Sequence, residues 1–489
     1  MSKFNRNLNK LTKNNEGHIA YEMSLIDRLI IQVLTGFFGE DKFYLNNSSQ
    51  IIKDIREVCI INPSFIANLA IYARKEMHLR SISHVLVAEL AKSSSGKKYA
   101  RETIYRVIER VDDMSEILAY YLNEFGKPIP NSMKKAIAEK LLTFDEYSIA
   151  KYKGDKELKI KDILCLVHPT PRDEEQSNMF KRILEGTLKT PITWQTKLST
   201  QGNTKESWEE LIENNNLGYM ALLRNLRNII KSNPKNIEKV YEILSDKDRV
   251  LKSKQLPFRF YTAFSTLYKE NLGTSKLYDA LETAIKHSTN NISKLKGKTF
   301  ISADVSGSMT MPISAKSEIT SANIAVLMMA ISNYICEETI TSTFDTVFNL
   351  KPMATNNGII SNALSIPVTG GGTDITLPIR YLLQKKIYVD RIILLSDNEI
   401  NYGYKETCQS YIEKYKRTIN PNVWVHGIDM QGYGTQQFCG NKVNIVSGWN
   451  EKMIEFISTV EEGVGDLRSK IENYHFKEEN YYEIHTGKI

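Results

Sequence analysis

The sequence predicts a multidomain protein, in which an all-α helical-repeat region of the HEAT type is followed by a doubly wound α/β domain. Three observations support this fold class. The chain has 489 residues, which is too long for one ordinary domain. Up to about residue 290, one segment after another has apolar residues at three- and four-residue spacing. Beyond residue 295, strand-like apolar runs alternate with helical segments, so we divide the chain into residues 1–294 and 295–489.

The first region is predicted to consist of many short helices packed side by side, because each segment has one apolar face and the connections are short. These connections contain Pro, Gly or Asn, and no alternating strand pattern interrupts the region. The repeat assignment depends on this density of helices, since no fixed sequence period is present. Clear examples are residues 64–76, 84–92, 101–111, 134–142 and 217–231.

In the second region, four apolar runs are typical of buried strands, and the segments between them are typical of helices. We expect strands at residues 298–305, 340–348, 389–396 and 423–429, and helices at residues 318–336, 375–386 and 404–416. This alternation predicts a mostly parallel sheet. Ligands of such sheets bind at the carboxyl ends of the strands, so a site is expected there.

Oxygen-bearing side chains lie in three loops of this region. Asp304, Ser306 and Ser308 form a DxSxS motif at the end of the first strand, Thr373 follows three glycines, and Asp397 follows the third strand. A DxSxS motif alone is a weak signal, because serine-rich turns after strands are common, but the three elements in this order are a strong one. Hydroxyl and carboxylate oxygens suit a hard cation. The sequence therefore predicts one bound divalent cation, Mg²⁺ or alternatively Mn²⁺.

These residues resemble the metal-ion-dependent adhesion site of von Willebrand factor A-like domains, and the resemblance covers about residues 296–465. It implies that Ser306, Ser308 and Thr373 bind the metal directly, and that the two aspartates bind it directly or through water. The alternative is a domain that kept these residues without holding a metal.

The charge of the chain is divided unevenly between the two regions. Residues 301–489 contain 16 Lys and Arg and 21 Asp and Glu, whereas residues 1–300 contain 48 and 36. The net charge of +7 therefore comes from the helical region. Such an asymmetry favours a polyanionic partner for that region, although a solvated helical surface is an equal alternative.

Six motifs of the helical region occur in a recognisable order: LRSISHVL at residues 79–86, FDEYSIAKYK at 144–153, KDILCLVHP at 161–169, TPITW at 190–194, GYMALLRNLRN at 218–228 and LPFRF at 256–260. They resemble the TROVE module shared by telomerase-associated, Ro and vault proteins, over nearly all of residues 20–290. Together with the α/β domain, the arrangement resembles the Ro autoantigen family. The resemblance implies that the helical repeats close into a ring whose hole takes single-stranded RNA ends, while small Y-type RNAs bind the outer basic surface.

A lysine-rich stretch is the first candidate for RNA contact, because cations follow phosphates and planar groups meet bases. It contains Lys151, Lys153, Lys156, Lys159 and Lys161, with Tyr152 among them. By the resemblance, Lys151 and His168 match positions that line the hole of Ro relatives. A solvated loop is the alternative, and Asp155 and Glu157 interrupt the basic run.

Two further pairs of basic residues are candidates for RNA contact. Lys134 and Lys135 begin a helix whose counterpart in Ro relatives meets the small non-coding RNA. Arg224 and Arg227 share one face of a helix, where ion pairs between packed helices are at least as good an explanation.

Other functional classes lack their sequence signals. There is no complete phosphate-binding loop, no GxSxG elbow and no HExxH motif, so we expect no enzymatic activity. The five cysteines are scattered, which favours reduced thiols and a cytoplasmic protein over a zinc site. No apolar run is long enough for a membrane span.

The sequence thus predicts a monomeric, RNA-binding scaffold for small non-coding RNA and for misfolded or single-stranded RNA ends, with an exoribonuclease or another protein as a further partner. The alternative is a metal-dependent protein-interaction scaffold that grips an acidic residue of its partner.

Overall fold

The computed structural model describes residues 10–14, 16–35, 44–152, 157–189, 191, 193–289, 294–312, 318–401, 406–447, 452–463 and 467–474. The chain forms two compact units. One contains residues 1–35 and 193–467, and the other contains residues 36–192 and 468–489. The units therefore cut across the sequence boundary at residue 295, because both the first residues and helices from 194 onward belong with the α/β domain.

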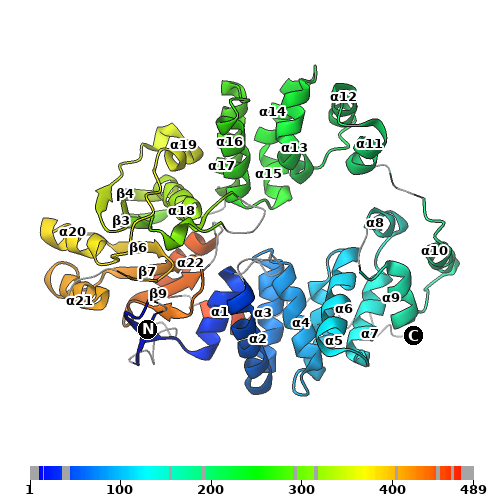
Figure 1. Ribbon diagram of the computed structural model, residues 1–489, viewed down its shortest axis with the longest axis horizontal. Helices are drawn as coiled ribbons and strands as arrows, with labels where there is room; N and C mark the ends of the chain where they lie inside the picture. Colours follow the sequence, from blue (N-terminus) through cyan, green and yellow to red (C-terminus); the bar gives the residue numbers. More distant parts are fainter. Residues whose placement is uncertain are drawn as a thin grey trace. The chain divides into compact units, whose positions relative to one another are not determined.

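The unit formed mainly by residues 36–192 is helical. Neighbouring helices pack side by side along the chain, with α3 against α4 and α5, and α5 against α7 (Figure 1). Its helices are α2 (Tyr44–Ile61), α3 (Pro63–Lys75), α4 (Ser81–Lys92), α5 (Lys97–Val107), α6 (Val111–Phe125), α7 (Asn131–Leu141), α8 (Glu146–Lys151), α9 (Ile160–Val167) and α10 (Glu174–Glu185).

The helix ends follow from local chemistry. At the start of α3, the Asn62 side chain accepts a hydrogen bond from the backbone N–H of Phe65, and Pro63 occupies the first turn. Gly186 ends α10 in the left-handed conformation at φ 73°. The expected helix over residues 101–111 is wrong at its end, since α5 stops at Val107 and α6 starts at Val111.

The other unit also contains helices that precede the sheet. The long helix α17 packs against α14, α15 and α16, and α13 packs against α16. These helices are α11 (Trp194–Gln201), α12 (Lys205–Glu213), α13 (Tyr219–Ser232), α14 (Ile237–Ser245), α15 (Lys247–Ser253), α16 (Pro257–Lys269) and α17 (Ser275–Thr289). The predicted helical-repeat class of residues 36–289 is confirmed in its described parts.

A mostly parallel sheet forms the centre of the α/β domain, as predicted. Its strands are ordered β5-β4-β3-β6-β7-β9, and β5 alone among them runs antiparallel to its neighbour. The strands are β3 (Leu295–Asp304), β4 (Cys336–Phe344), β5 (Phe348–Leu350), β6 (Arg391–Ser396), β7 (Trp424–Asp429) and β9 (Val443–Ser447). The sheet is therefore doubly wound, and the carboxyl ends of β3, β6 and β7 meet at one edge.

Helices cover this sheet. The apolar helix α18 (Ser321–Ile335) packs against β3 and β4, while α22 (Lys452–Glu461) packs against β7 and β9 (Figure 1). The helices α20 (Leu377–Lys385) and α21 (Cys408–Thr418) pack together. The expected strand over residues 340–348 is confirmed for residues 340–344, which lie in β4, and is wrong at its end. Asp345 turns the chain there: its Oδ1 atom accepts the Val347 N–H at 2.7 Å, and β5 then returns antiparallel to β4.

A β-hairpin near the N-terminus was not predicted by the helical pattern. Strands β1 (Leu11–Lys13) and β2 (Ile19–Glu22) pair with each other, and β2 pairs with β8 (Thr435–Gln436) of the α/β domain. The helix α1 (Leu25–Thr35) then packs against β9. The start of the chain is thus built into the α/β domain.

Among the described residues, no helix is both long and apolar enough to cross a membrane. All five cysteines are free thiols.

Candidate metal centre and nucleic-acid interface

The DxSxS loop begins at a fully buried carboxylate. Asp304 is 0% exposed, and its Oδ1 atom accepts the Ser306 N–H at 2.9 Å. Its Oδ2 atom accepts the Ser396 hydroxyl at 2.6 Å. The hydroxyl oxygens of Ser306 and Ser308 lie 3.3 Å apart. The end of β3 is therefore fixed to the end of β6, with both serine hydroxyls side by side.

The glycine loop before Thr373 is held against the DxSxS loop by backbone hydrogen bonds. The Gly307 N–H donates to the Gly371 carbonyl at 2.7 Å, and the Gly370 N–H donates to the Val305 carbonyl at 2.9 Å. A Cβ atom on Gly307 would lie 3.1 Å from the Gly370 carbonyl oxygen, so the close approach favours glycine. The Thr373 N–H donates to Asn401, which follows β6, at 2.8 Å.

The three loops leave buried oxygen atoms without partners. Thr373 Oγ1 and Asp397 Oδ2 have no hydrogen-bond partner among the described residues, although the two side chains are 1% and 0% exposed. Such atoms cost free energy when they stay unsatisfied, on the order of 1–3 kcal/mol each and more for a charge. Oxygen atoms of this kind fit a hard cation. The residue set chosen from the sequence thus lies together and fits a divalent cation.

The electrostatics of the site also favour a bound cation. Burial raises the pKa of Asp304 to about 7, and the nearby Asp397 carboxylate adds to the shift. Burial also raises the pKa of Asp397. Two buried carboxylates that repel one another are stabilised by a cation between them.

Lys134 and Lys135 lie on α7, in the helical unit. Lys135 is exposed and Lys134 is partly exposed. Later on the same helix, the Lys140 ammonium lies 4.5 Å from the centre of the Tyr105 ring, and burial lowers the pKa of Lys140. The first two lysines are therefore available to a polyanion, whereas Lys140 is engaged in packing.

Lys151 ends α8 and is exposed. Its ammonium lies 5.6 Å from the Tyr152 ring centre, and the Arg110 guanidinium lies 4.6 Å from the same ring. Lys153 lies outside the described residues. His168 is exposed and ends α9 in the left-handed conformation at φ 48°. No sequence spacing reveals the pairing of Arg110 with Tyr152, which adds a cation and an aromatic ring to this end of the unit.

The two arginines of α13 differ in their surroundings. Arg224 is exposed. Arg227 forms an ion pair with Glu270 at 2.7 Å, and Lys231 pairs with the same carboxylate at 2.8 Å. Arg227 therefore forms an ion pair between helices, which was the alternative to RNA contact for this residue. A role of Arg227 in RNA contact stays a prediction.

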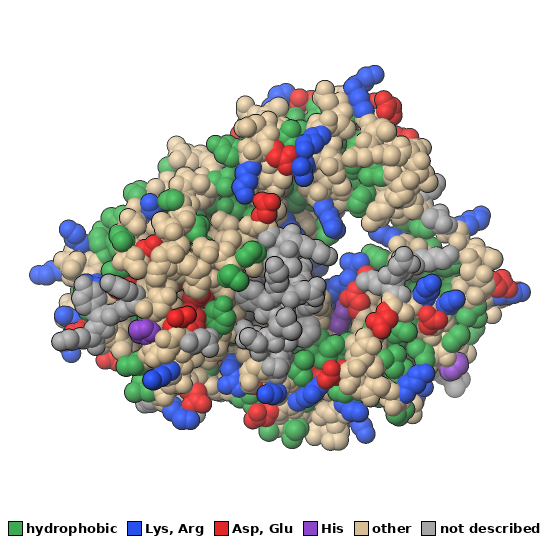
Figure 2. All heavy atoms as spheres, viewed as in Figure 1, with side chains coloured by type: hydrophobic (Ala, Val, Ile, Leu, Met, Phe, Trp, Pro, Cys, Tyr) green, Lys and Arg blue, Asp and Glu red, His purple; other side chains and the backbone are tan. Residues whose placement is uncertain are grey.

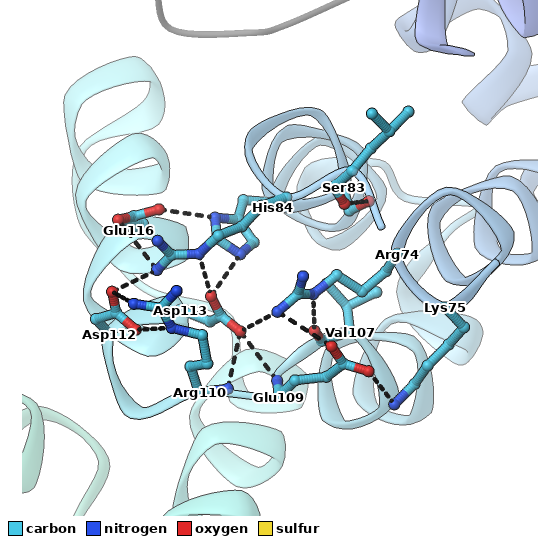
Figure 3. A network of polar contacts seen from close by, with 12 residues as sticks. Arg74, Lys75, Ser83, His84, Val107, Glu109, Arg110, Asp112, Asp113 and Glu116 are labelled. Atoms are coloured by element: carbon cyan, nitrogen blue, oxygen red, sulfur yellow. Dashed lines mark hydrogen bonds and ion pairs between the residues drawn. The ribbon is translucent and has the colours of Figure 1, made fainter. Parts of the chain in front are cut away.

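A buried polar network fixes the packing of α3, α4 and α6 (Figure 3). Asp113 accepts hydrogen bonds from Arg74 at 3.0 Å and Arg80 at 2.6 Å, and its Oδ1 atom lies 3.3 Å from His84 Nε2. Burial alone would raise the pKa of Asp113, but His84, Arg74 and Arg80 together hold it well below its usual range. Asp113 also accepts the Glu109 N–H, which explains why α5 and α6 are separate helices. His84 is 2% exposed and thus serves packing.

Basic and acidic side chains are interspersed on the face of the molecule shown in Figure 2. The net charge of the chain therefore does not locate an RNA-binding surface on this face. Local clusters of cations and aromatic rings, such as Lys151 with Tyr152 and Arg110, are better candidates for an RNA contact.

The fold and its loops define a class: a helical-repeat protein joined to an α/β domain of the von Willebrand factor A type. Two family models match the chain and agree with this class. One described as the TROVE domain matches residues 38–190 and 185–276, and one described as the Ro60 vWA domain matches residues 298–458. The chain belongs to the TROVE family, in its Ro-type form with a C-terminal von Willebrand factor A domain.

Relatives outside these models are distant. Telomerase protein component 1 of Rattus norvegicus is 23% identical over 308 residues, covering 44% of this chain and 12% of that protein. The Mus musculus protein of the same name is 24% identical with the same coverage, so the chain spans a small part of these relatives. The crystal structure of Deinococcus radiodurans RO (RSR) protein matches with a TM-score of 0.64 at 17% identity, over 90% of this chain and 100% of that chain, and shows the same fold.

Proposed function

We propose that this chain is a cytoplasmic RNA-binding scaffold for small, Y-type non-coding RNA and for misfolded or single-stranded RNA ends. The main support is the TROVE match, which covers the part of the chain that carries the basic excess. Within it, Lys151, Tyr152 and Arg110 combine cations with an aromatic face, which suits unpaired RNA. We assign no catalytic residue, and we propose that the chain acts as a monomer.

We further propose that Asp304, Ser306, Ser308, Thr373 and Asp397 hold one Mg²⁺ or Mn²⁺ ion. The unpartnered oxygens of Thr373 and Asp397 support this assignment. Such an ion would supply positive charge at the carboxyl edge of the sheet and an attachment point for an oxygen ligand.

The test of RNA binding compares two labelled RNAs in filter binding with the full-length chain. One RNA is a hairpin with a single-stranded 3′ tail, and the other is the same hairpin with a blunt end. Tighter binding of the tailed RNA supports the proposal. Equal and salt-independent binding of both RNAs would count against it, because phosphate neutralisation makes RNA affinity fall as salt rises.

A second candidate function is a metal-dependent contact with a protein, including an exoribonuclease, that offers an acidic residue. The observation in its favour is a pair of exposed apolar side chains beside the metal loops. Met311, which follows Ser308 by three residues, is 53% exposed, and Val347, beside Asp345, is 57% exposed. Binding that requires Mg²⁺ and is lost in Asp304→Ala, with RNA affinity unchanged, would favour this candidate.

A further inference from the structure

Asp429 is a fully buried aspartate at the edge of the sheet that carries the metal loops, and it lies outside the five-residue motif. It is the last residue of β7 and is 0% exposed. In the parallel register it pairs with Ser396, whose hydroxyl donates to Asp304 and whose next residue is Asp397. The adjacent strands β3, β6 and β7 thus each end at or beside an aspartate.

The two oxygens of the Asp429 carboxylate have different environments. Oδ1 accepts the backbone N–H groups of Gln431 at 2.9 Å and Gly432 at 2.7 Å. Oδ2 is buried and accepts no hydrogen bond of normal geometry among the described residues, although the Asn398 side chain is near enough to the carboxylate to favour its charged form. Asp397 shows the same division, because its Oδ1 accepts the Glu399 N–H at 3.1 Å while its Oδ2 is unpartnered. An unpaired buried charge of this kind is unfavourable without a compensating cation.

The loop after Asp429 reaches the metal loops directly. Gln431 donates from its side-chain amide to the Ser308 carbonyl at 2.9 Å, and Tyr433 donates to Gln431 at 2.6 Å. The Met430 N–H donates to the Ser396 carbonyl at 3.0 Å. The carboxylate that fixes the backbone of Gln431 therefore also helps to fix Ser308.

We propose that Asp429 is a positioning residue of the metal centre, whose free carboxylate oxygen acts on the bound cation through water. This inference rests on the proposed cation site. Among the described residues, no three His, Cys, Asp or Glu side chains are placed to ligate one ion together, so a direct third carboxylate ligand does not fit. Groups that surround the direct ligands commonly affect metal affinity by about 10- to 100-fold.

The test measures Mn²⁺ binding by calorimetry in the full-length protein and its Asp429→Asn variant. Asparagine keeps an oxygen that can accept the N–H groups of Gln431 and Gly432, so the loop stays anchored and the negative charge alone is removed. We expect Mn²⁺ affinity to fall at least about tenfold. The melting temperature of the metal-free protein should not fall, because the substitution removes an unpaired buried charge.

The matched control is Asp390→Asn, at the opposite end of the sheet. Asp390 accepts the Lys298 N–H at 2.7 Å, just before β6 begins, and serves the fold there. Its substitution should leave Mn²⁺ affinity unchanged. Wild-type affinity in Asp429→Asn, or a lower melting temperature of that variant without metal, would overturn the inference. If the wild-type chain itself binds no Mn²⁺, the proposed cation site fails instead.

Discussion

The side-chain amide of Asn14 donates a buried hydrogen bond of 2.9 Å to the carbonyl oxygen of Ile400, which is 386 positions further along the chain. Ile400 lies in the loop that begins at Asp397. The Asn14 Oδ1 atom accepts the His18 N–H at 2.8 Å, so one side chain shapes the hairpin turn and joins it to the metal loop.

From this contact we predict that Asn14→Ala lowers the free energy of unfolding by about 1–3 kcal/mol, because the Ile400 carbonyl is left without its buried donor. Chemical denaturation of the full-length chain measures the change. Lys10→Ala is the control in the same hairpin: Lys10 pairs with Glu22 at 2.8 Å, but its side chain is 78% exposed, so little change is expected. Equal effects of the two substitutions would contradict the prediction.

Asp304→Ala should abolish Mg²⁺ and Mn²⁺ binding and leave the helical unit folded. The reason is that Asp304 connects Ser306 of the DxSxS loop to Ser396 of the next strand. Calorimetry measures the binding, and the melting transition without metal reports folding. Undiminished metal binding in the variant would refute the assigned site.

Changing Lys151 and His168 together to Ala should weaken binding of RNA with a single-stranded 3′ tail and affect blunt RNA much less. Each desolvated charged contact is worth on the order of 1–3 kcal/mol. Filter binding with both RNAs is the measurement. Lys181→Ala serves as a control, because this lysine of the same unit is 72% exposed and its distance to Glu185 is 4.0 Å. Equal losses for the two RNAs would mean that Lys151 and His168 do not recognise the tail.

The affinity of the full-length chain for small RNA should fall linearly with salt on a log–log plot, with a slope of roughly −0.7 per neutralised phosphate of single-stranded RNA. Replacing Lys134 and Lys135 with Glu should weaken binding and make the slope shallower, because both lysines are accessible on α7. Metal affinity should not change. A slope near zero in the wild type would refute the electrostatic basis of the RNA proposal.

Acid should weaken the α/β domain through Glu461. This carboxylate accepts hydrogen bonds from Arg391 at 2.8 Å and 2.6 Å and lies 2.9 Å from His426 Nε2. Burial opposes its ionisation, but Arg391 and His426 lower its pKa to about 2. Since the pKa is lower in the folded state, the stabilisation is complete above the unfolded value near 4.5 and is lost as the pH falls toward 2.

The corresponding measurement is urea denaturation of the wild type and Glu461→Gln at pH 7 and pH 3. At pH 7 the variant should be less stable by about 3–5 kcal/mol, because the buried Arg391 guanidinium loses its ion pair with Glu461. The difference should shrink at pH 3. A difference that does not depend on pH would show that Glu461 contributes by packing rather than by charge.

The sequence was sufficient to predict the α/β domain and the placing of the five motif residues in neighbouring loops, because apolar strands and oxygen-bearing loops both follow local patterns; that these residues bind a metal stays a prediction. Thr373, Ser306 and Asp397 are brought together by the parallel order of the strands, which the alternation of elements already implies. Pairing between strands that are far apart in the sequence leaves no local pattern of this kind. Strand β2 has four residues and pairs with β8, and nothing in either segment indicates the other.

Residues that contact RNA are harder to predict from the sequence, and the candidates named here stay predictions, because a basic residue on a helix looks the same whether it faces solvent, an acidic neighbour or a ligand. Arg227 and Arg224 share a helix face, yet Arg227 pairs with Glu270. Asp429 was missed for a different reason. The observation that suggests a role for this aspartate is its buried oxygen without a hydrogen-bond partner, and a sequence does not show hydrogen bonding.

The pairing of β2 with β8 also sets an order of events during synthesis. Tyr21 leaves the ribosome early, but its partner Gln436 follows only after most of the chain has been made. At usual elongation rates of about 5–20 residues per second, the hairpin waits roughly 20–80 seconds for its third strand. During that time the edge of β2 has no partner strand from the α/β domain and is open to pairing with other strands, which is the usual route to aggregation of an exposed edge.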